Sequence, residues 1–299
     1  MKIWYSYLAL ETKKLFRRRG LEMKKTFTKT IDGNAPSVRK MDFEALENVP
    51  RYYFNDNAIM THAINSFHVI FPEGERFFIR SVKPFQERIQ NESLKNRIKA
   101  FIGQEVQHGK EHERVWTSIR NFGLPLDRIA RFYHFTCYKI IFNVLGFLFG
   151  PKINLSITAA LEHYTANLGE ISLKHDLTKD VQGDMKKLLI WHACEEIEHK
   201  SVVYDVLQEV APSYFLRIAG YMIATVMLWS YAILFQYWFL LADKNVSWKK
   251  FKSDRVYARE QMNISVPPLY DGFLKYFKKD FHPDQMGGYE LAEAKLATL

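Results

Sequence analysis

Two short stretches of the chain carry the same pair of side chains at the same spacing. Glu105 precedes His108 by three positions, and Glu196 precedes His199 by three. Residues three apart lie on one face of an α-helix, so each pair can offer a carboxylate oxygen and an imidazole nitrogen to a metal ion. Two such pairs, each with a lone glutamate on another helix, form the ligand set of a four-helix di-metal site. The pattern therefore restricts the chain to folds that bring four helices around one interior.

A lone glutamate precedes each pair at an interval that suits a helical hairpin. Glu75 lies 30 residues before Glu105, and Glu162 lies 34 residues before Glu196. The gap between Glu105 and Glu162 leaves room for an apolar crossover helix at 126–149. A helix pair, a crossover and a second helix pair make the ferritin-like topology. We therefore predict an all-α fold: a ferritin-like four-helix di-metal bundle with additional apolar helices.

The remaining pattern is also helical, with very few alternating apolar runs. We expect helices at 58–90, 93–121, 126–149, 152–177, 179–210 and 213–242, with shorter ones beyond 247. Pro72 interrupts the first of these, so a start near Pro72 is an alternative. We predict a basic N-terminal extension at 1–50, the di-metal helical domain at 51–245, and a helical or irregular tail at 246–299.

The predicted metal ligands are the glutamates and histidines of these motifs: Glu75, Glu105, His108, Glu162, Glu196 and His199. We expect each Glu-x-x-His pair to bind one metal, with the lone glutamates completing or bridging the set. His192 precedes Glu196 by four positions and is a candidate seventh ligand. His112 and Glu170 share faces with ligands and are candidates for contacting them from outside. Four neighbours in sequence point away from the ligand face, so we expect them at the surface or behind the ligands as hydrogen-bond partners: Glu73, Glu195, Glu198 and His163.

Mixed carboxylate and imidazole ligation favours iron, or alternatively manganese, because structural zinc sites prefer cysteine. We therefore expect two metal ions as the cofactor. Only Cys137 and Cys194 are present, which favours a reducing, cytoplasmic location.

Three segments resemble a bacterial family known as predicted metal-dependent hydrolases. They are residues 71–78, 104–112 and 191–200, and the resemblance spans most of residues 40–280. It implies ferritin-like di-metal ligands. The His-x-x-x-Glu-x-x-His spacing at 192–199 is also similar to p-aminobenzoate N-oxygenase-type di-iron enzymes, in which an added histidine binds the metal. This second resemblance implies seven ligands, the six above and His192.

These features predict a di-iron enzyme that activates dioxygen and oxidises an apolar, aromatic or lipid-like substrate, with an electron donor as partner. Two alternatives stay open. One is a metal-dependent hydrolase that uses a metal-bound hydroxide. The other is a non-enzymatic bundle that stores metal or scavenges oxidants.

The formal net charge is +9, and a basic arm between Lys13 and Lys29 contributes much of it. The chain shows no nucleic-acid recognition motif, so we expect no nucleic-acid partner. Attraction to anionic headgroups fits the arm better, and a solvated charged arm is the alternative.

Residues 218–242 pass without a charged side chain. At ~1.5 Å per residue this segment is long enough to cross a hydrocarbon layer of ~30 Å. Together with the apolar helix at 132–149 it would form a membrane-dipping face that admits a lipid-like substrate. We therefore expect association with the inner face of the membrane. A helix buried all round inside the bundle is the alternative.

Overall fold

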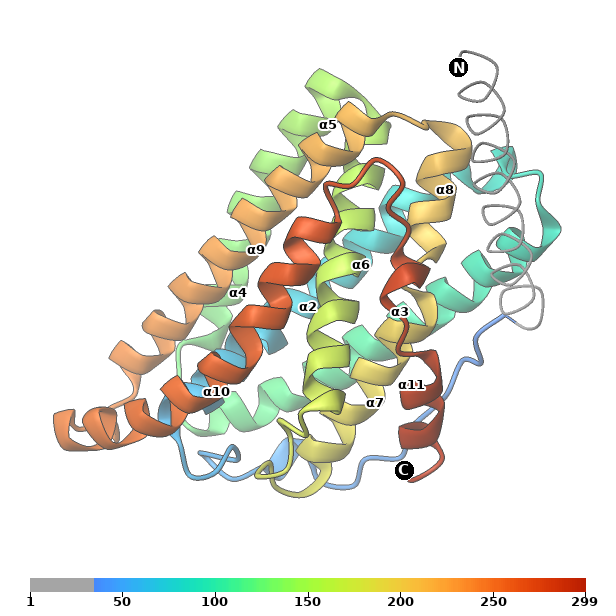
Figure 1. Cartoon of the computed structure of the whole chain (residues 1–299). Coiled ribbons are helices and arrows are strands. Elements are labelled where there is room, and N and C mark those ends of the chain that lie inside the picture. Colours follow the sequence, from blue (N-terminus) through green and yellow to red (C-terminus); the bar gives the residue numbers. More distant parts are fainter. Residues whose placement is uncertain (1–34) are drawn as a thin grey trace, which may run out of the picture. The chain divides into compact units, whose positions relative to one another are not determined.

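Helices account for the ordered elements of the computed structural model, which describes residues 35–299 (Figure 1). The predicted all-α class is confirmed, and the only β pairing in that range is an isolated bridge between Phe54 and Val181. The basic arm between Lys13 and Lys29 lies outside the described residues. The α-helices are α2 (Ala58–Val82), α3 (Glu92–Asn121), α4 (Leu126–Tyr133), α5 (Asn143–Phe149), α6 (Pro151–Lys174), α7 (Gly183–His199), α8 (Val202–Val210), α9 (Tyr214–Ala242), α10 (Trp248–Lys275) and α11 (Tyr289–Leu296).

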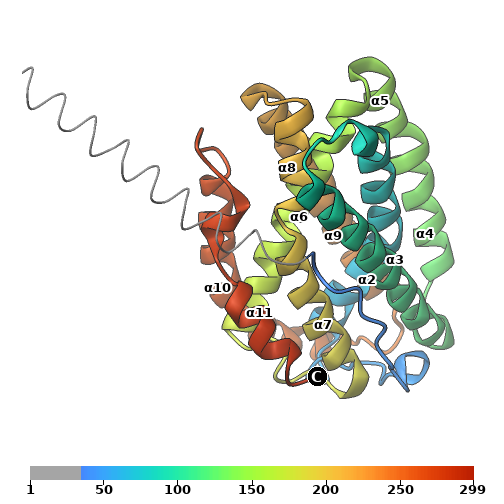
Figure 2. The ribbon, with the colours of Figure 1, turned by 90° about the vertical axis from the view of Figure 1, so that its right-hand side faces the viewer.

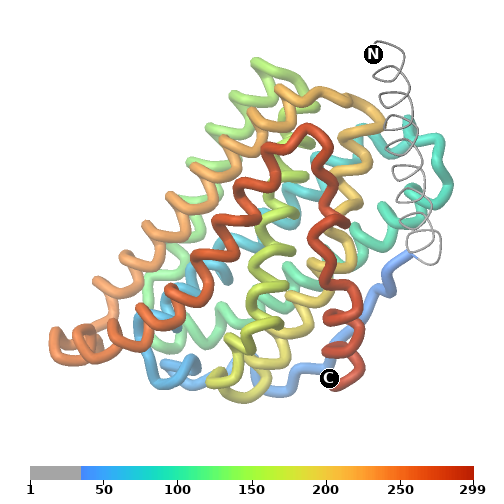
Figure 3. The backbone as a smooth tube through the Cα atoms, in the orientation of Figure 1, coloured from blue at the N-terminus to red at the C-terminus, as the bar shows by residue number. Residues whose placement is uncertain are grey.

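Four helices surround the interior that holds the Glu/His motifs. Helix α2 packs against α3, and α6 packs against α7. Contacts of α2 with α6 and of α3 with α7 join the two pairs (Figures 1 and 3). A short 3-10 turn, η2 (Lys83–Arg88), connects α2 to α3, and Asn91 caps α3 by accepting a hydrogen bond from the Leu94 amide at 3.1 Å. Each pair is therefore a hairpin of two helices that follow one another in the chain.

Helix α2 starts at Ala58 and continues through Pro72, so the alternative start near Pro72 is wrong. Proline has no N–H and would leave the carbonyl of His68, four residues earlier, without its helical partner. The Trp116 indole on α3 supplies that partner, because its Nε1 donates to the His68 oxygen at 2.8 Å. A side chain from the neighbouring helix therefore compensates for the proline.

The crossover between the two helix pairs contains a π-helical stretch, η3 (His134–Phe142), between α4 and α5. This apolar run ends at Gly150, whose φ of 77° lies in the left-handed region, and Pro151 then starts α6. Helix α9 packs against α2 and α6 through one stripe, and its opposite stripe is exposed. By length and composition alone, Leu126–Phe149 and Tyr214–Ala242 are each long and apolar enough to cross a membrane.

The segments before and after the bundle also pack on it. Residues 36–299 form one compact unit. Phe43 and Leu46 are buried in its core, although both lie within the predicted extension at 1–50. Helix α10 contacts α2 and α6, and α11 contacts α6 and α7 (Figure 2). The predicted tail at 246–299 is therefore mostly helical and packed.

Candidate metal centre

The structure brings all seven predicted ligands into the interior of the four helices. Each helix contributes: Glu75 comes from α2, Glu105 and His108 from α3, Glu162 from α6, and His192, Glu196 and His199 from α7. None of the seven exposes more than 5% of its surface. Ionisable side chains are rarely buried so completely without a partner, so this cluster requires an explanation.

The two Glu-x-x-His pairs meet each other across the interior. One donor atom from each of Glu105, His108, Glu196 and His199 lies within 4.8 Å of the others. His199 Nε2 is 3.2 Å from Glu105 Oε1, and His108 Nδ1 is 3.6 Å from Glu196 Oε1. The sequence had suggested one metal per pair, whereas the structure gathers both pairs around one position.

A second group adjoins the first. It contains Glu75, His112 and His192, again with donor atoms within 4.8 Å of one another. The groups meet where His192 Nε2 lies 2.7 Å from Glu196 Oε1. Glu162 belongs to neither group, but its Oε2 accepts a hydrogen bond from His199 Nδ1 at 2.8 Å. Each of these two adjacent groups of buried donors could hold a metal ion.

Several ligand atoms of this cluster have no hydrogen-bond partner within residues 35–299. They are both carboxylate oxygens of Glu75 and Glu105, Glu162 Oε1, Glu196 Oε2, His108 Nδ1 and His199 Nε2. A buried polar atom without a partner costs about 1–3 kcal/mol. Carboxylate oxygens and imidazole nitrogens are all lone-pair donors, so bound cations would satisfy them together. The residues present therefore fit metal ions.

Burial also determines the ionisation of these carboxyl groups. It raises the pKa of Glu75 and of Glu105 well above the usual value. It raises the pKa of Glu162 to about 7, although the His199 imidazole opposes the shift. Burial acts in the same direction on Glu196, but the neighbouring histidines outweigh it, His199 most strongly, and its pKa falls to about 2. Without a cation, the cluster thus favours protonated carboxyls at Glu75 and Glu105 and an ionised one at Glu196.

The outer nitrogen of His108 is held by Glu195, one of the neighbours that the sequence placed at the surface or behind the ligands. His108 Nε2 donates to Glu195 Oε2 at 3.0 Å, and Glu195 is fully buried. Arg39 Nη1 in turn donates to Glu195 Oε1 at 3.0 Å. These two hydrogen bonds fix the His108 ring so that its other nitrogen, Nδ1, is directed at the cluster. No spacing rule pointed to Arg39, which lies 156 residues from Glu195.

Histidines from three helices form a second outer chain. His192 Nδ1 lies 2.7 Å from His112 Nε2, and His112 Nδ1 lies 2.7 Å from His68 Nδ1. His112 therefore has both nitrogens engaged, although its donor atoms lie near those of Glu75. Sequence reasoning missed His68. Its position seven residues before Glu75, on the same face of α2, was the available signal.

The other predicted neighbours lie elsewhere. The Glu170 carboxylate lies against Gly288 and belongs to neither donor group. Glu73 pairs with Arg76 at 3.0 Å. His163 Nε2 lies 3.0 Å from the carbonyl oxygen of Gly272 on α10, with which it can share a hydrogen bond. Glu73 thus pairs within α2, and His163 links α6 to α10.

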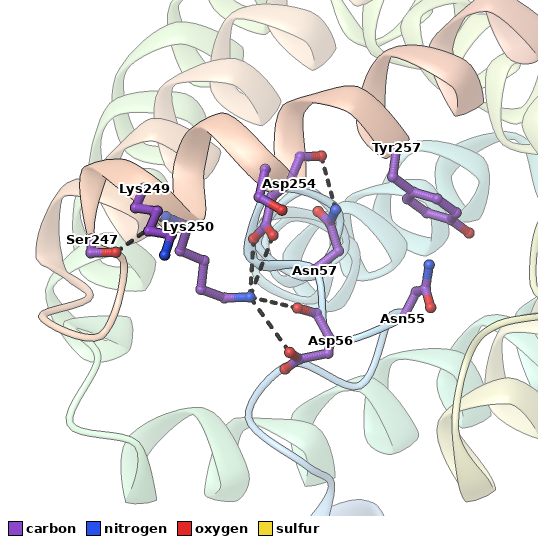
Figure 4. Close-up of a pocket in the computed structure, with 9 residues that line it drawn as sticks. Asn55, Asp56, Asn57, Ser247, Lys249, Lys250, Asp254 and Tyr257 are labelled. Atoms are coloured by element: carbon purple, nitrogen blue, oxygen red, sulfur yellow. Dashed lines mark hydrogen bonds and ion pairs between the residues drawn. The ribbon is translucent and has the colours of Figure 1, made fainter.

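A polar hollow of about 490 Å³ lies at the start of α2 (Figure 4). Lys250 on α10 donates to the Asp56 carbonyl at 2.6 Å and pairs with Asp254 at 3.3 Å, and Asp254 Oδ2 accepts from the Ala58 amide at 2.7 Å. Ala58 is 17 residues before Glu75, or about 26 Å along the helix. The hollow is therefore remote from the cluster, and its side chains fasten α10 to the beginning of α2.

A helical bundle with buried, convergent carboxylate and imidazole donors defines a class of metal-binding protein. The family model described as "Predicted metal-dependent hydrolase" matches residues 37–287. The chain belongs to this family, as its motifs had suggested. No curated protein and no solved structure matches the chain. The ferritin-like name for the bundle consequently stays a prediction.

Proposed function

We propose that this protein is a di-metal enzyme and that hydrolysis is its reaction. The observation that carries the proposal is the convergence of buried, unpartnered donor atoms from Glu75, Glu105, His108, Glu162, Glu196 and His199. The description of the family supports hydrolysis over the other reactions that such a site can perform. Oxidation with dioxygen, our expectation from sequence, becomes the second candidate.

In this proposal Glu105, His108, Glu196 and His199 hold one metal ion. Glu75 and His192 hold the other, and Glu162 completes the set. When bound, two such ions polarise a substrate oxygen and lower the pKa of bound water towards neutrality. Iron and manganese suit this mixture of oxygen and nitrogen donors.

The chain's own residues orient the donors and exclude bulk water. Glu195 holds His108 through Nε2, and Glu162 holds His199 through Nδ1, so the opposite nitrogen of each ring faces inward. Glu162, whose pKa is about 7 in the metal-free cluster, would give up its proton on binding metal near neutral pH. The near-complete burial of all seven side chains strengthens each electrostatic interaction.

We propose an apolar substrate group on the basis of a nearby cavity. A cavity of about 250 Å³ lies between α2, the crossover and α6, with Phe77, Tyr138 and Phe142 in its wall. Ser81, also in that wall, donates a hydrogen bond from Oγ to Thr158 Oγ1 at 2.8 Å. Thr158 lies one helical turn before Glu162. Arg80, Asn143 and Asn154 also line the cavity, so it suits an acyl or aryl group that carries polar atoms.

His192 is the observation that favours the second candidate, a dioxygen-activating di-iron enzyme. Its Nε2 lies 2.7 Å from Glu196 Oε1 and 3.9 Å from Glu75 Oε1, so a third imidazole reaches the position between the two groups. Such a reaction also requires an electron donor. A metal-storage bundle is a third possibility, which metal stoichiometry distinguishes.

Turnover with and without oxygen separates the two reactions. Protein loaded with Fe²⁺ or Mn²⁺ would be assayed anaerobically with p-nitrophenyl acyl esters of several chain lengths. Hydrolysis predicts metal-dependent release of p-nitrophenol without oxygen, lost in Glu105→Gln and kept in Glu170→Gln. The result against it is absence of anaerobic turnover together with oxygen consumption by the reduced, iron-loaded protein.

A further inference from the structure

Large apolar side chains are exposed along two neighbouring helical runs. On Leu126–Phe149 they are Phe132, Phe135, Ile140, Val144, Phe147, Leu148 and Phe149. On α9 they are Phe215, Met222, Val226, Ile233, Leu234, Tyr237 and Leu241. Phe147 is 88% exposed, and Phe215 and Leu241 are 84% and 86% exposed at opposite ends of α9. We call these two sets the crossover–α9 face.

The two runs lie side by side and antiparallel, so the face is continuous. The rings of Phe132 and Trp238 are 5.8 Å apart, and Thr136 Oγ1 is 2.8 Å from Tyr231 Oη. Figure 1 shows α9 alongside α4 and α5. Contiguous apolar patches on soluble monomers rarely exceed about 300–600 Å², and larger ones mark binding surfaces. This face extends along 29 residues of α9, or roughly 43 Å.

The opposite stripe of α9 argues against a simple transmembrane passage. Tyr221, Leu228 and Phe235 are buried against the bundle, and α9 contacts both α2 and α6. An isolated span would have to separate α9 from these partners and expose their core. The helix can instead keep its inner stripe on the bundle and offer only its outer stripe to an apolar partner.

The charges on this face indicate which partner it suits. Asp127 is the only acidic residue in Leu126–Phe149 and α9, and it pairs with Arg120 at 2.9 Å. The basic residues Arg128, Arg131 and Lys139 are exposed on the same run. A second copy seated on the face would offer these cations no free carboxylate, because the only acidic side chain of the two runs is paired with Arg120. An apolar stripe flanked by Arg and Lys instead complements a leaflet that contains anionic lipid.

We propose that the crossover–α9 face seats the protein on an anionic membrane leaflet, with both helical runs lying in the plane of the surface. The exposed apolar side chains enter about 5–10 Å below the headgroups, the depth typical of interfacial helices. Lys139 reaches the phosphates by extending its side chain along the surface. The proposal does not depend on which reaction the metal site performs.

Vesicle flotation of the full chain tests this assignment. The probe is vesicles of phosphatidylcholine with 30% phosphatidylglycerol, in 0.5 M NaCl to suppress purely electrostatic binding by basic segments. The disrupting variant is Val226→Asp with Ile233→Asp, both in the middle of the face. Val256→Asp on α10 is the matched control, because Val256 is also exposed and α10 lies away from α4 (Figure 2). Circular dichroism and thermal unfolding establish that all variants are folded.

We expect wild type and Val256→Asp to float with the vesicles and the double variant to lose at least ten-fold in partitioning. Three results would overturn the proposal. The first is no flotation of wild type, and the second is equal flotation of the double variant. The third is a wild type that does not bind vesicles but forms a concentration-dependent dimer, which the double variant does not form. A second copy of the chain would then occupy the face.

Discussion

His112 Nε2 lies 2.7 Å from His192 Nδ1, at the point where a helix of the first pair meets a helix of the second. A nitrogen that binds metal carries no proton, so a metal-binding His192 Nε2 requires the ring proton on Nδ1. His112 Nε2 accepts a hydrogen bond from that Nδ1–H and thereby selects the tautomer. His112 itself donates from Nδ1 to His68 at 2.7 Å. The contact makes His112 a positioning residue.

Replacing His112 should therefore weaken metal binding without removing a ligand. We expect His112→Ala to raise the dissociation constant for Fe²⁺ or Mn²⁺ by about 10–100-fold, the usual effect of losing an outer partner of a metal-binding histidine. Titration with the metal ion measures this directly. Glu170→Gln, on α6 but outside both donor groups, should bind like wild type. An unchanged constant in His112→Ala would refute the positioning role.

Gly109 on α3 leaves the space that the Glu75 carboxylate occupies. A Cβ at position 109 would come within 2.7 Å of Glu75 Oε2, so Gly109→Ala must displace that carboxylate. We expect loss of one metal equivalent or a strong drop in its affinity, measured by elemental analysis after dialysis. Gly74→Ala is the control, because its nearest neighbour would be Tyr138 Oη at 3.8 Å. Equal occupancy in both variants would show that Glu75 is not a ligand.

The pKa shifts predict how metal and protons compete. Burial raises the folded-state pKa of Glu75 and Glu105, and raises that of Glu162 to about 7 from a usual 4.5. A raised pKa contributes stability below the unfolded value, and that contribution is lost as pH rises through the folded value. The stability that Glu162 contributes to the metal-free protein is thus lost between about pH 4.5 and 7, while metal affinity increases because binding expels protons.

The thermal midpoint with and without metal, measured across this pH range, tests the competition. We expect the difference in thermal midpoint between the metal-loaded and the metal-free protein to widen with rising pH. Calorimetry in buffers of different ionisation enthalpy should show proton release on binding. A gap that narrows towards neutral pH, or binding without proton release, would contradict the assigned carboxyl states.

Asp243 should govern stability far from the metal site. At the end of α9 it accepts hydrogen bonds from Arg51 at 2.8 Å, Tyr52 at 2.9 Å and His62 at 3.0 Å. Burial alone would raise its pKa, but the bonds from His62 and Arg51 outweigh burial and lower it well below the usual 3.8. The stability that ionised Asp243 contributes is present above about pH 4 and is lost as pH falls through its folded-state pKa.

We expect Asp243→Asn to lower the free energy of unfolding by about 2 kcal/mol at neutral pH. The loss relative to wild type should shrink on acidification below about pH 4, because wild type then loses the same interaction. Denaturant unfolding at several pH values measures both effects. Asp127→Asn, which breaks an exposed ion pair with Arg120, should change stability little. A similar effect of the two variants would refute the buried network.

The helices were predictable because their signals are local. The expected helix at 126–149 coincides with α4, η3 and α5 together, and the one at 213–242 differs from α9 by a single residue. The run through Pro72 was ambiguous, because its resolution depends on Trp116, 44 residues away. The packing of Phe43 and Leu46 was missed for a similar reason, since a short irregular segment carries no period.

Helical spacing predicted which side chains form the candidate site, but not how they are grouped. Intervals of three, four and about thirty residues led to seven side chains that the structure places together. How these side chains group depends on the rotation and height of the helices, which spacing does not encode. Glu195 and Arg39 show the same limit, because their contact joins an irregular segment to α7.

Metal stoichiometry tests the central claim most directly. The protein would be loaded anaerobically with Fe²⁺ or Mn²⁺, freed of loose metal and measured by elemental analysis, alongside Glu196→Ala. Our account predicts two metal ions per chain in wild type and clearly fewer in Glu196→Ala, whose carboxylate lies between the two donor groups. No retained metal, many ions per chain, or full occupancy in Glu196→Ala would contradict it.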